Sequence, residues 1–262
     1  MTKQTDYRKT KLACYLGFVT QAITANFVPL LFLTFYAHYG ISYARLSLIP
    51  LTFFVTQLIV DFLSSGVVDR VGYRKSMILA QILSGLGLAA LAVVPDLCPD
   101  PFPGILLCVI LYAIGSGLIE VMCSPIIEAC PFENKAGTMS LLHSFYCWGS
   151  VGTILLSTLF FAFFGTGSWR IMACLWAVIP LYNVCNFATC PMVPIVPAGE
   201  GMTIPQLLKT RIFWVFILLM VCAGASEISM AQWASAFAES SLGISKTWGI
   251  WRVPAGLRSL WA

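Results

Sequence analysis

The stretch Ser65-Gly66-Val67-Val68-Asp69-Arg70-Val71-Gly72-Tyr73-Arg74-Lys75 joins two long apolar segments of the chain, 44–68 and 76–95. It gathers three basic side chains and one acid around Gly72, and a glycine permits the tight turn that such a short connection needs. Each flanking segment has close to the roughly 20 apolar residues with which a helix crosses a hydrocarbon core of about 30 Å. We therefore interpret the stretch as a short basic loop between two membrane-spanning helices.

The composition of the whole chain also indicates a membrane protein. Of its 262 residues, 59% are hydrophobic and 10% are charged, and the mean hydropathy is +0.86. Soluble domains carry about 25% charged residues, so in water this chain would expose large apolar surfaces. The net charge of +4 is small, and no basic arm or basic-aromatic stripe indicates nucleic acid as a partner. The expected surroundings are a lipid bilayer.

Apolar runs repeat along the chain on both sides of the loop. We expect seven spanning helices, at 12–36, 44–68, 76–95, 103–129, 138–164, 169–190 and 212–236. The first lacks a small-residue cleavage site, so we expect it to stay in the membrane rather than leave as a signal peptide. The predicted fold is an all-α integral membrane protein. Its expected parts are a six-helix bundle over 1–190, a cytoplasmic linker over 191–211, a seventh helix over 212–238 and an aberrant tail over 239–262.

The lysines and arginines predict the orientation. If the segments alternate across the bilayer, most basic residues fall on one side: Lys3, Arg8, Lys9, Lys11, Arg70, Arg74, Lys75, Lys135, Lys209 and Arg211. Arg45, Arg170 and Lys246 fall on the other side. The positive-inside rule places the first group, with the N-terminus, in the cytoplasm. We expect a multi-pass protein of the plasma (cell inner) membrane.

Ten cysteines raise the question of disulfides or a metal site. Most of them lie inside apolar segments, and the sequence holds neither a CxxC pair nor a cluster of cysteine and histidine. Cysteines in such positions pack as small apolar residues. We therefore expect no metal and no cofactor.

In position and pattern, the 65–75 loop resembles the signature loop of the major facilitator superfamily, G-x-x-x-D-R-x-G-R-R/K, which lies between the second and third helices. The matching residues are Asp69, Arg70, Gly72 and Lys75, with Arg74 as a second base. The loop departs from the pattern at Ser65 and Tyr73. The resemblance implies that the matching residues form a gating latch. It also implies a parent fold of twelve helices in two halves, with the substrate between them.

The fourth apolar segment carries a second resemblance, in Gly115-Ser116-Gly117-Leu118-Ile119-Glu120-Val121-Met122-Cys123-Ser124-Pro125. This run is similar to the G-x-x-L-E-x-x-x-N-P element of the fucose:proton symporter branch, with Ser124 in the place of asparagine. The resemblance implies that Glu120 faces a central cavity and takes part in proton coupling. The acid that this branch carries in its first helix has no counterpart here, where Gln21 and Asn26 are present instead.

Glu120 also stands out on physical grounds. An ionisable group inside a spanning helix costs roughly 2.5–3.5 kcal/mol on insertion scales, so it usually faces a polar interior and has a function. The alternative, a carboxyl that only hydrogen-bonds between helices, stays open. The same reasoning applies with less force to Asp61, for which a basic partner at a domain interface is one interpretation. It applies likewise to Glu128, a snorkelling or latch residue, and to Glu227 in the seventh helix.

The fifth segment presents a polar and aromatic face. At 3.6 residues per turn, one side of the helix carries His143, Tyr146, Cys147 and Ser150. Rings that stack on the C–H faces of a sugar, beside hydrogen-bonding groups, suit a sugar-like substrate. A packed aromatic interface with a hydrogen-bonded histidine is an equal alternative. Further candidates for the cavity wall are Gln21 and Asn26 in the first helix and Gln232 and Trp233 in the seventh.

Together these features predict a secondary transporter that moves a small polar solute, a sugar, by proton-coupled symport with alternating access. The alternatives are a membrane receptor or sensor without transport, and a drug or metabolite exporter of the same superfamily. An enzyme is not expected, because the chain has no HExxH helix, GxSxG elbow or paired-aspartate site. The residues after Lys246 begin no eighth apolar segment. We interpret this as a truncation or frameshift near residue 246, and expect a fragment that does not transport alone.

Overall fold

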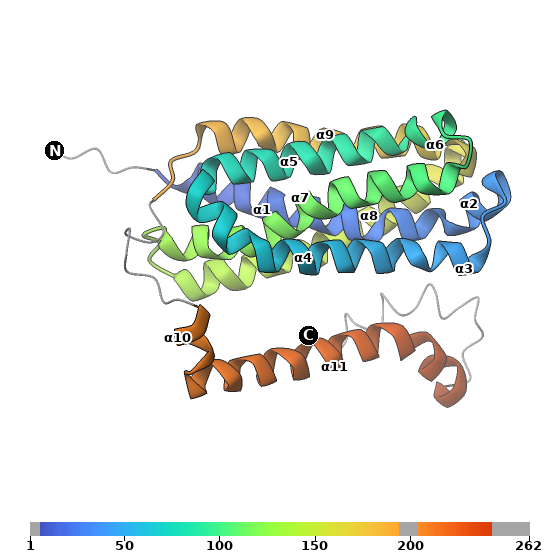
Figure 1. The fold of residues 1–262 in the computed structure, drawn as a ribbon. Helices are drawn as coiled ribbons and strands as arrows, with labels where there is room; N and C mark the ends of the chain where they lie inside the picture. The colour runs from blue at the N-terminus through green and yellow to red at the C-terminus, as the bar shows by residue number, and fades with distance from the viewer. Residues whose placement is uncertain (1–5, 194–203, 243–262) are drawn as a thin grey trace. The chain divides into compact units, whose positions relative to one another are not determined.

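The computed structural model describes residues 6–193 and 204–242 of the chain. These residues divide between two compact units, Met1–Ile195 and Val196–Ala262. Every regular element among the described residues is a helix, and Figure 1 shows the long helices of the first unit running side by side. The all-α architecture predicted from the apolar segments is therefore present.

The helices alternate with short connections in both units. The first unit contains α1 (Arg8–Asn26), η1 (Val28–Leu31), α2 (Phe32–Tyr39), α3 (Tyr43–Leu46), α4 (Leu48–Val71), α5 (Tyr73–Leu91), α6 (Val94–Leu97), α7 (Pro101–Ala129), α8 (Lys135–Phe164), η2 (Thr166–Ser168) and α9 (Trp169–Thr189). The second unit contains α10 (Ile204–Leu208) and α11 (Arg211–Leu242). α10 lies within the expected linker, and α11 runs past the expected end of the seventh helix. The remainder of the expected tail, from residue 243, lies outside the described residues.

Five segments of the described chain are long and apolar enough to cross a membrane: Arg8–Tyr39, Tyr43–Ser64, Pro101–Ala129, Lys135–Phe164 and Thr166–Thr189. The third and seventh expected spans are not among them. α5 is a helix of 19 residues, and Arg74, Lys75 and Gln81 lower its hydropathy. The apolar part of α11 that the structure describes is the shorter stretch Arg211–Ser226.

α5 packs closely against α7 and α9, and small residues bring its backbone into direct contact with α7. A Cβ atom at Gly87 would lie 2.7 Å from the backbone nitrogen of Tyr112. A Cβ atom at Gly115 would lie 2.4 Å from the carbonyl oxygen of Ala80. Glycine permits such close approach, which stabilises helix pairs in lipid through van der Waals contact. Because α7 and α9 pack closely around α5, this more polar helix is accommodated within the bundle.

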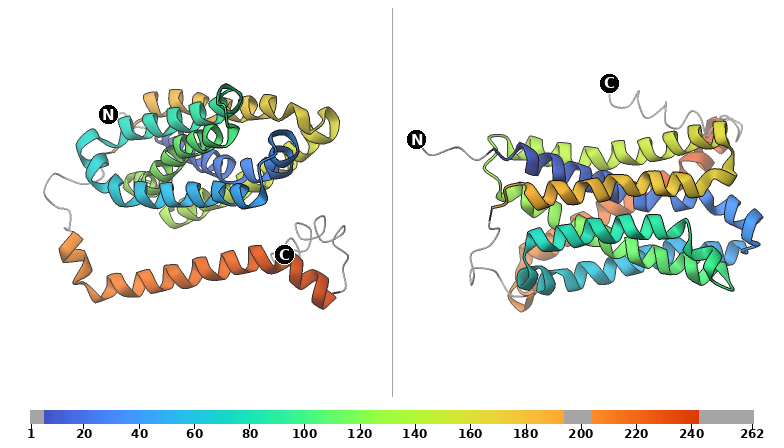
Figure 2. Two further views of the ribbon diagram at one scale, coloured as in Figure 1. Left: turned by 45° about the vertical axis from the view of Figure 1, so that its right-hand side comes forward. Right: turned by 90° about the horizontal axis from the view of Figure 1, so that it is seen from above.

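α1 and α7 lie at the centre of the first unit, and α4 and α8 lie at its edges (Figure 2). α7 packs against α1, α4 and α5, and α1 packs against α7, α8 and α9. In the most apolar part of each span, 61% of the residues of α7 are buried, against 17% in α8. The open sides of α4 and α8 carry large apolar residues such as Phe62 and Trp148. Such surfaces suit contact with lipid or with further helices.

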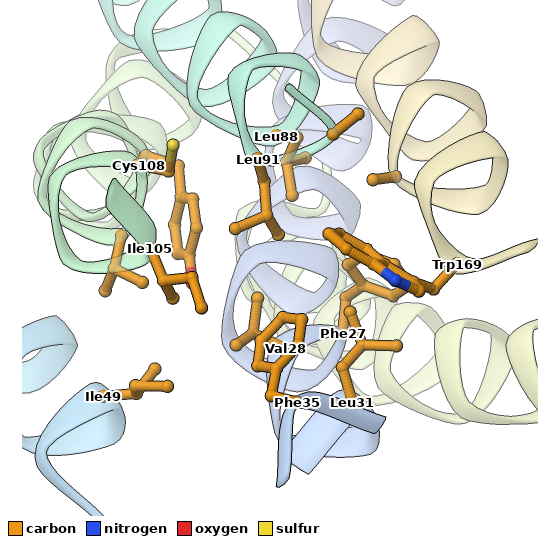
Figure 3. Packing of buried hydrophobic residues seen from close by; sticks show 14 of the residues in the cluster. Phe27, Val28, Leu31, Phe35, Ile49, Leu88, Leu91, Ile105, Cys108 and Trp169 are labelled. Carbon is orange, nitrogen blue, oxygen red and sulfur yellow. The ribbon is translucent and has the colours of Figure 1, made fainter. Parts of the chain in front are cut away.

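Two clusters of buried side chains hold these helices together. The cluster at the end of the bundle that contains Gly40, hereafter the Gly40 end, includes Phe27, Phe35 and Trp169 (Figure 3). The cluster toward the opposite end, hereafter the Gly72 end, includes Cys14, Phe18, Met77, Ile119, Cys123 and Phe187. Because lipid tails are as apolar as these side chains, close packing rather than exclusion from water provides most of their stabilising effect in a bilayer.

The first expected span is a broken helix rather than a continuous one. α1 ends at Asn26, and η1 interrupts the path before α2 begins at Phe32. Pro29 has no N–H to donate to the carbonyl of Ala25, so an α-helix cannot continue through it undisturbed. Irregular backbone at membrane depth is tolerated where it is enclosed by protein or lines a cavity. The first expected span therefore corresponds to Arg8–Tyr39, with a 3₁₀ turn at Val28–Leu31 within it.

Candidate functional site

Glu120 lies where three helices of the bundle meet. The side-chain amides of Gln21, from α1, and Gln57, from α4, both donate to Oε2 of Glu120, with 3.0 Å between Gln21 Nε2 and that oxygen. The two glutamines are 7% and 8% exposed, whereas Glu120 itself is exposed. Hydrogen bonds to an ionised acceptor are about twice as strong as neutral ones. One carboxylate therefore ties α1 and α4 to α7.

Asp61 approaches the same place from α4. It follows Gln57 by one turn, and Gly117 precedes Glu120 by about one turn, so each pair shares a face of its helix. A Cβ atom at Gly117 would lie 3.1 Å from Val60 and 3.4 Å from Asp61 Oδ1. The missing side chain thus leaves room for Asp61 beside the face of α7 that bears Glu120. The basic partner expected for Asp61 is absent among the described ion pairs.

A line of hydroxyl and amide groups continues from Gln21 between α1, α5 and α7. Thr24 Oγ1 lies 2.9 Å from the carbonyl oxygen of Gln21 and 3.3 Å from Ser116 Oγ. One turn earlier, Thr20 Oγ1 lies 3.3 Å from Gln81 Oε1, and this glutamine is fully buried. The sequence prediction missed this line. The available signal was the one-turn spacing of threonines within an apolar helix.

The polar face predicted on α8 meets α1, on another side from α4. Asn26 Nδ2 donates to Ser150 Oγ at 3.1 Å, and the ring of His143 packs edge-on against Phe18 at 5.3 Å between centroids. Tyr146 packs against the cluster toward the Gly72 end, and Cys147 is exposed. Gln21, which donates to Glu120, also belongs to α1. The two groups share α1 as a common wall.

The residues of the expected gating latch lie around the turn from α4 to α5. Gly72 has φ +89°, which confirms the tight turn predicted there. Arg74 donates to the carbonyl oxygens of Phe187, Ala188 and Cys190 at 2.9, 3.0 and 2.7 Å, so it satisfies the last carbonyls of α9. Arg70 and Lys75 are exposed, and the side chain of Asp69 lies outside the described part of the chain.

The remaining candidates lie apart from this site. Glu128 is at the end of α7, with its side chain 61% exposed and its carboxylate 3.6 Å from Lys135 Nζ. That position matches the snorkelling interpretation better than a place in the cavity wall. Glu227, Gln232 and Trp233 lie on α11, and their side chains are outside the described residues.

A small pocket opens beside the break in the first span. Its lining comes from α1, η1, α4 and α7: Thr24, Ala25, Val28, Pro29, Ile49, Pro50, Phe53, Phe54 and Tyr112. Thr24 belongs both to this pocket and to the polar line that leads to Gln21 and Glu120. The pocket therefore adjoins the candidate site on the side of the Gly40 end.

Comparison with known proteins agrees with the bundle architecture. The family model described as Major Facilitator Superfamily matches residues 13–259. The chain is also similar to a solved structure, the inward-open conformation of the xylose transporter XylE from E. coli, with 17% identity and a TM-score of 0.62. That match covers 71% of this chain and 48% of the other, so this chain spans about half the length of that transporter. No curated protein matches. At this identity, the structural likeness shows a shared fold and confirms the predicted one.

Proposed function

The chain belongs to the major facilitator superfamily, and we propose that it serves proton-coupled symport of a sugar-like solute. The observation that carries the proposal is the setting of Glu120. The residue is exposed, and two enclosed amides from other helices donate to its carboxylate. An ionisable group at membrane depth that contacts several helices fits a site for loading and releasing a proton.

The hydrogen bonds of Glu120 suggest how protonation would change the bundle. An ionised carboxylate only accepts, and here it accepts from Gln21 and Gln57. A proton turns one carboxyl oxygen into a donor, so an amide must rotate or lose its bond if the proton occupies Oε2. Protonation would therefore alter how firmly α1 and α4 are held to α7. Such a difference in contacts is what allows a proton to bias one conformation over another.

The assignment of a sugar rests on the walls beside this site. Asn26 of α1 donates a hydrogen bond to Ser150 of α8, and Phe18 of α1 packs against His143 of α8. Hydrogen-bonding groups beside aromatic rings match the hydroxyls and C–H faces of a sugar. The resemblance of the 115–125 run to the fucose:proton symporter branch favours the same class. So does the name of the xylose transporter whose fold is similar.

The latch and the orientation complete the proposal. The positive-inside rule supports an orientation in which the basic Gly72 end faces the cytoplasm, in the plasma membrane. Arg74 ties the start of α5 to the end of α9 there. We infer that the turn at Gly72 can change conformation while this tie keeps α5 and α9 together.

The test is accumulation of labelled pentoses and hexoses by proteoliposomes that contain the full-length protein. An inward proton gradient should drive accumulation, and Glu120→Gln should abolish it while sugar exchange at equilibrium persists. The matched control is Glu128→Gln, an acid of the same helix at its exposed end, which should accumulate sugar as the wild type does. Binding of sugar without accumulation would refute symport and favour a sensor. Gradient-driven accumulation that survives Glu120→Gln would refute the role of Glu120.

A further inference from the structure

Asp61 has no part in the function proposed so far, although it adjoins Gly117 on the face of α7 that bears Glu120. Its Oδ1 atom is enclosed by protein and has no hydrogen-bond partner among the described residues. Burying a carboxylate oxygen without a hydrogen-bond donor is unfavourable in free energy, because the oxygen loses its hydrogen bonds to water and no protein group replaces them. No salt bridge among the described residues involves Asp61, so an ion pair does not account for the presence of this acid in the bundle.

Gln21 presents a second acceptor of the same kind. Its Oε1 atom is enclosed and lacks a partner among the described residues, while its Nε2 donates to Glu120. The whole side chain is 7% exposed, so water from outside does not readily supply the missing donor. Two enclosed acceptors without donors therefore adjoin one carboxylate. A proton bound among these atoms would give one of the two acceptors a hydrogen-bond donor.

The hydrogen bonds to Glu120 leave a place for that proton. Both amides reach the same oxygen, Oε2, so the other carboxylate oxygen stays available. Asp61 reaches the face of α7 that bears Glu120, because Gly117 has no side chain there. Two carboxylates that lie side by side do not titrate independently, since a proton on one removes the charge that the other meets.

We propose that Asp61 and Glu120 form one proton-binding unit that carries a single shared proton through the transport cycle. The inference rests on the proposed function, because it takes Glu120 as the group that loads the coupling proton. It adds a stoichiometry of one proton for each solute. The shared proton supplies the donor that Asp61 Oδ1 or Gln21 Oε1 lacks.

The other titratable or charged groups on the helices around the pair have different surroundings. On α7, Glu128 pairs with Lys135 of α8, and Tyr112 is buried in the cluster of the Gly40 end. On α5, Arg74 binds the end of α9 and Lys75 is exposed.

The titratable groups of the remaining helices also have other partners. His143 of α8 packs on Phe18, and Asp96 of α6 pairs with Arg170. α1 carries Arg8, Lys9 and Lys11 near its start, and Cys14 and Cys123 lie together in the cluster toward the Gly72 end.

Infrared difference spectroscopy of the protein in proteoliposomes tests the unit, because the C=O stretch of a protonated carboxyl is separate from that of a carboxylate. In the wild type, the pair should lose its protons in two steps more than about one pH unit apart. Asp61→Asn and Glu120→Gln should each leave a single step at a pH between those two. The double variant should show neither step, and Glu128→Gln should match the wild type in both.

The outcome that overturns the proposal is independent titration: each single variant loses one step and leaves the other at its wild-type pH. Carbodiimide labelling of the wild type needs no variant and covers the case in which a substitution prevents folding. It modifies protonated carboxyls, so at a pH between the two steps each chain should take one adduct, on Asp61 or on Glu120. Chains labelled at both positions would contradict a shared proton. Neither measurement requires transport, so coupled titration without gradient-driven uptake would refute the proposed function alone.

Discussion

Replacing Gly115 with alanine should destabilise the first unit by about 2 kcal/mol, roughly a 30-fold change in the unfolding equilibrium. The new Cβ atom would lie 2.3 Å from Ser84 Oγ and 2.4 Å from the carbonyl oxygen of Ala80. The hydroxyl can rotate away, but the carbonyl belongs to the backbone of α5. Its distance is a full ångström inside the 3.4 Å at which ordinary contact begins. α5 and α7 must therefore separate.

The magnitude follows from two opposing effects. Overpacking a well-filled interface costs about 1–3 kcal/mol, and a collision with backbone belongs at the upper end of that range. The higher helix propensity of alanine returns up to about 1 kcal/mol. Unfolding of the purified protein by sodium dodecyl sulfate in mixed micelles, followed by circular dichroism, measures the difference. Removing the hydroxyl as well, with Ser84→Ala, should not rescue the variant, because the collision with Ala80 remains.

A matched glycine on α8 provides the control. Nothing lies within 4 Å of a Cβ atom at Gly152, so Gly152→Ala should be neutral or stabilise the protein by up to about 1 kcal/mol. The reasoning is refuted if Gly115→Ala is as stable as the wild type. It is refuted equally if both alanine variants lose the same stability, since the space around the two glycines would then not matter.

Arg74→Ala should lower the stability by about 2 kcal/mol in the same assay, because three charge-assisted hydrogen bonds to the end of α9 are lost. Arg74→Lys should recover part of that loss, and equal losses would argue against the hydrogen bonds. Glu128→Gln should change the stability by less than about 0.5 kcal/mol, since the ion pair with Lys135 is exposed. Burial raises the pKa of Cys130 to about 11. Its alkylation by iodoacetamide, followed by peptide mass spectrometry, should therefore be slow at neutral pH and speed up about tenfold per pH unit toward that value. A rate that levels off near pH 8 would contradict the burial of this thiol.

The predictions that succeeded depend on properties of short stretches of chain. The all-α fold followed from runs of apolar residues, because a bilayer requires backbone groups to be satisfied within each helix. The turn at Gly72 followed from one residue whose backbone tolerates a positive φ. The superfamily resemblance rested on local spacing around Asp69, and the family model that matches residues 13–259 confirms it. The apolar runs did not predict the local effects of single residues, such as the 3₁₀ turn beside Pro29 in the first span and the lower hydropathy that Gln81 gives to α5.

The sequence by itself therefore determined that this chain is a helical membrane protein of a transporter family with an ionisable residue, Glu120, at membrane depth. Only the tertiary structure decided which groups meet that residue. Gln21, Gln57 and Asp61 come from two other helices, and each helix could rotate about its axis without changing its hydropathy. The rotation that brings them together depends on close contacts such as the one that Gly117 allows with α4. Contacts of that kind join residues far apart in the chain, and no local pattern specifies them.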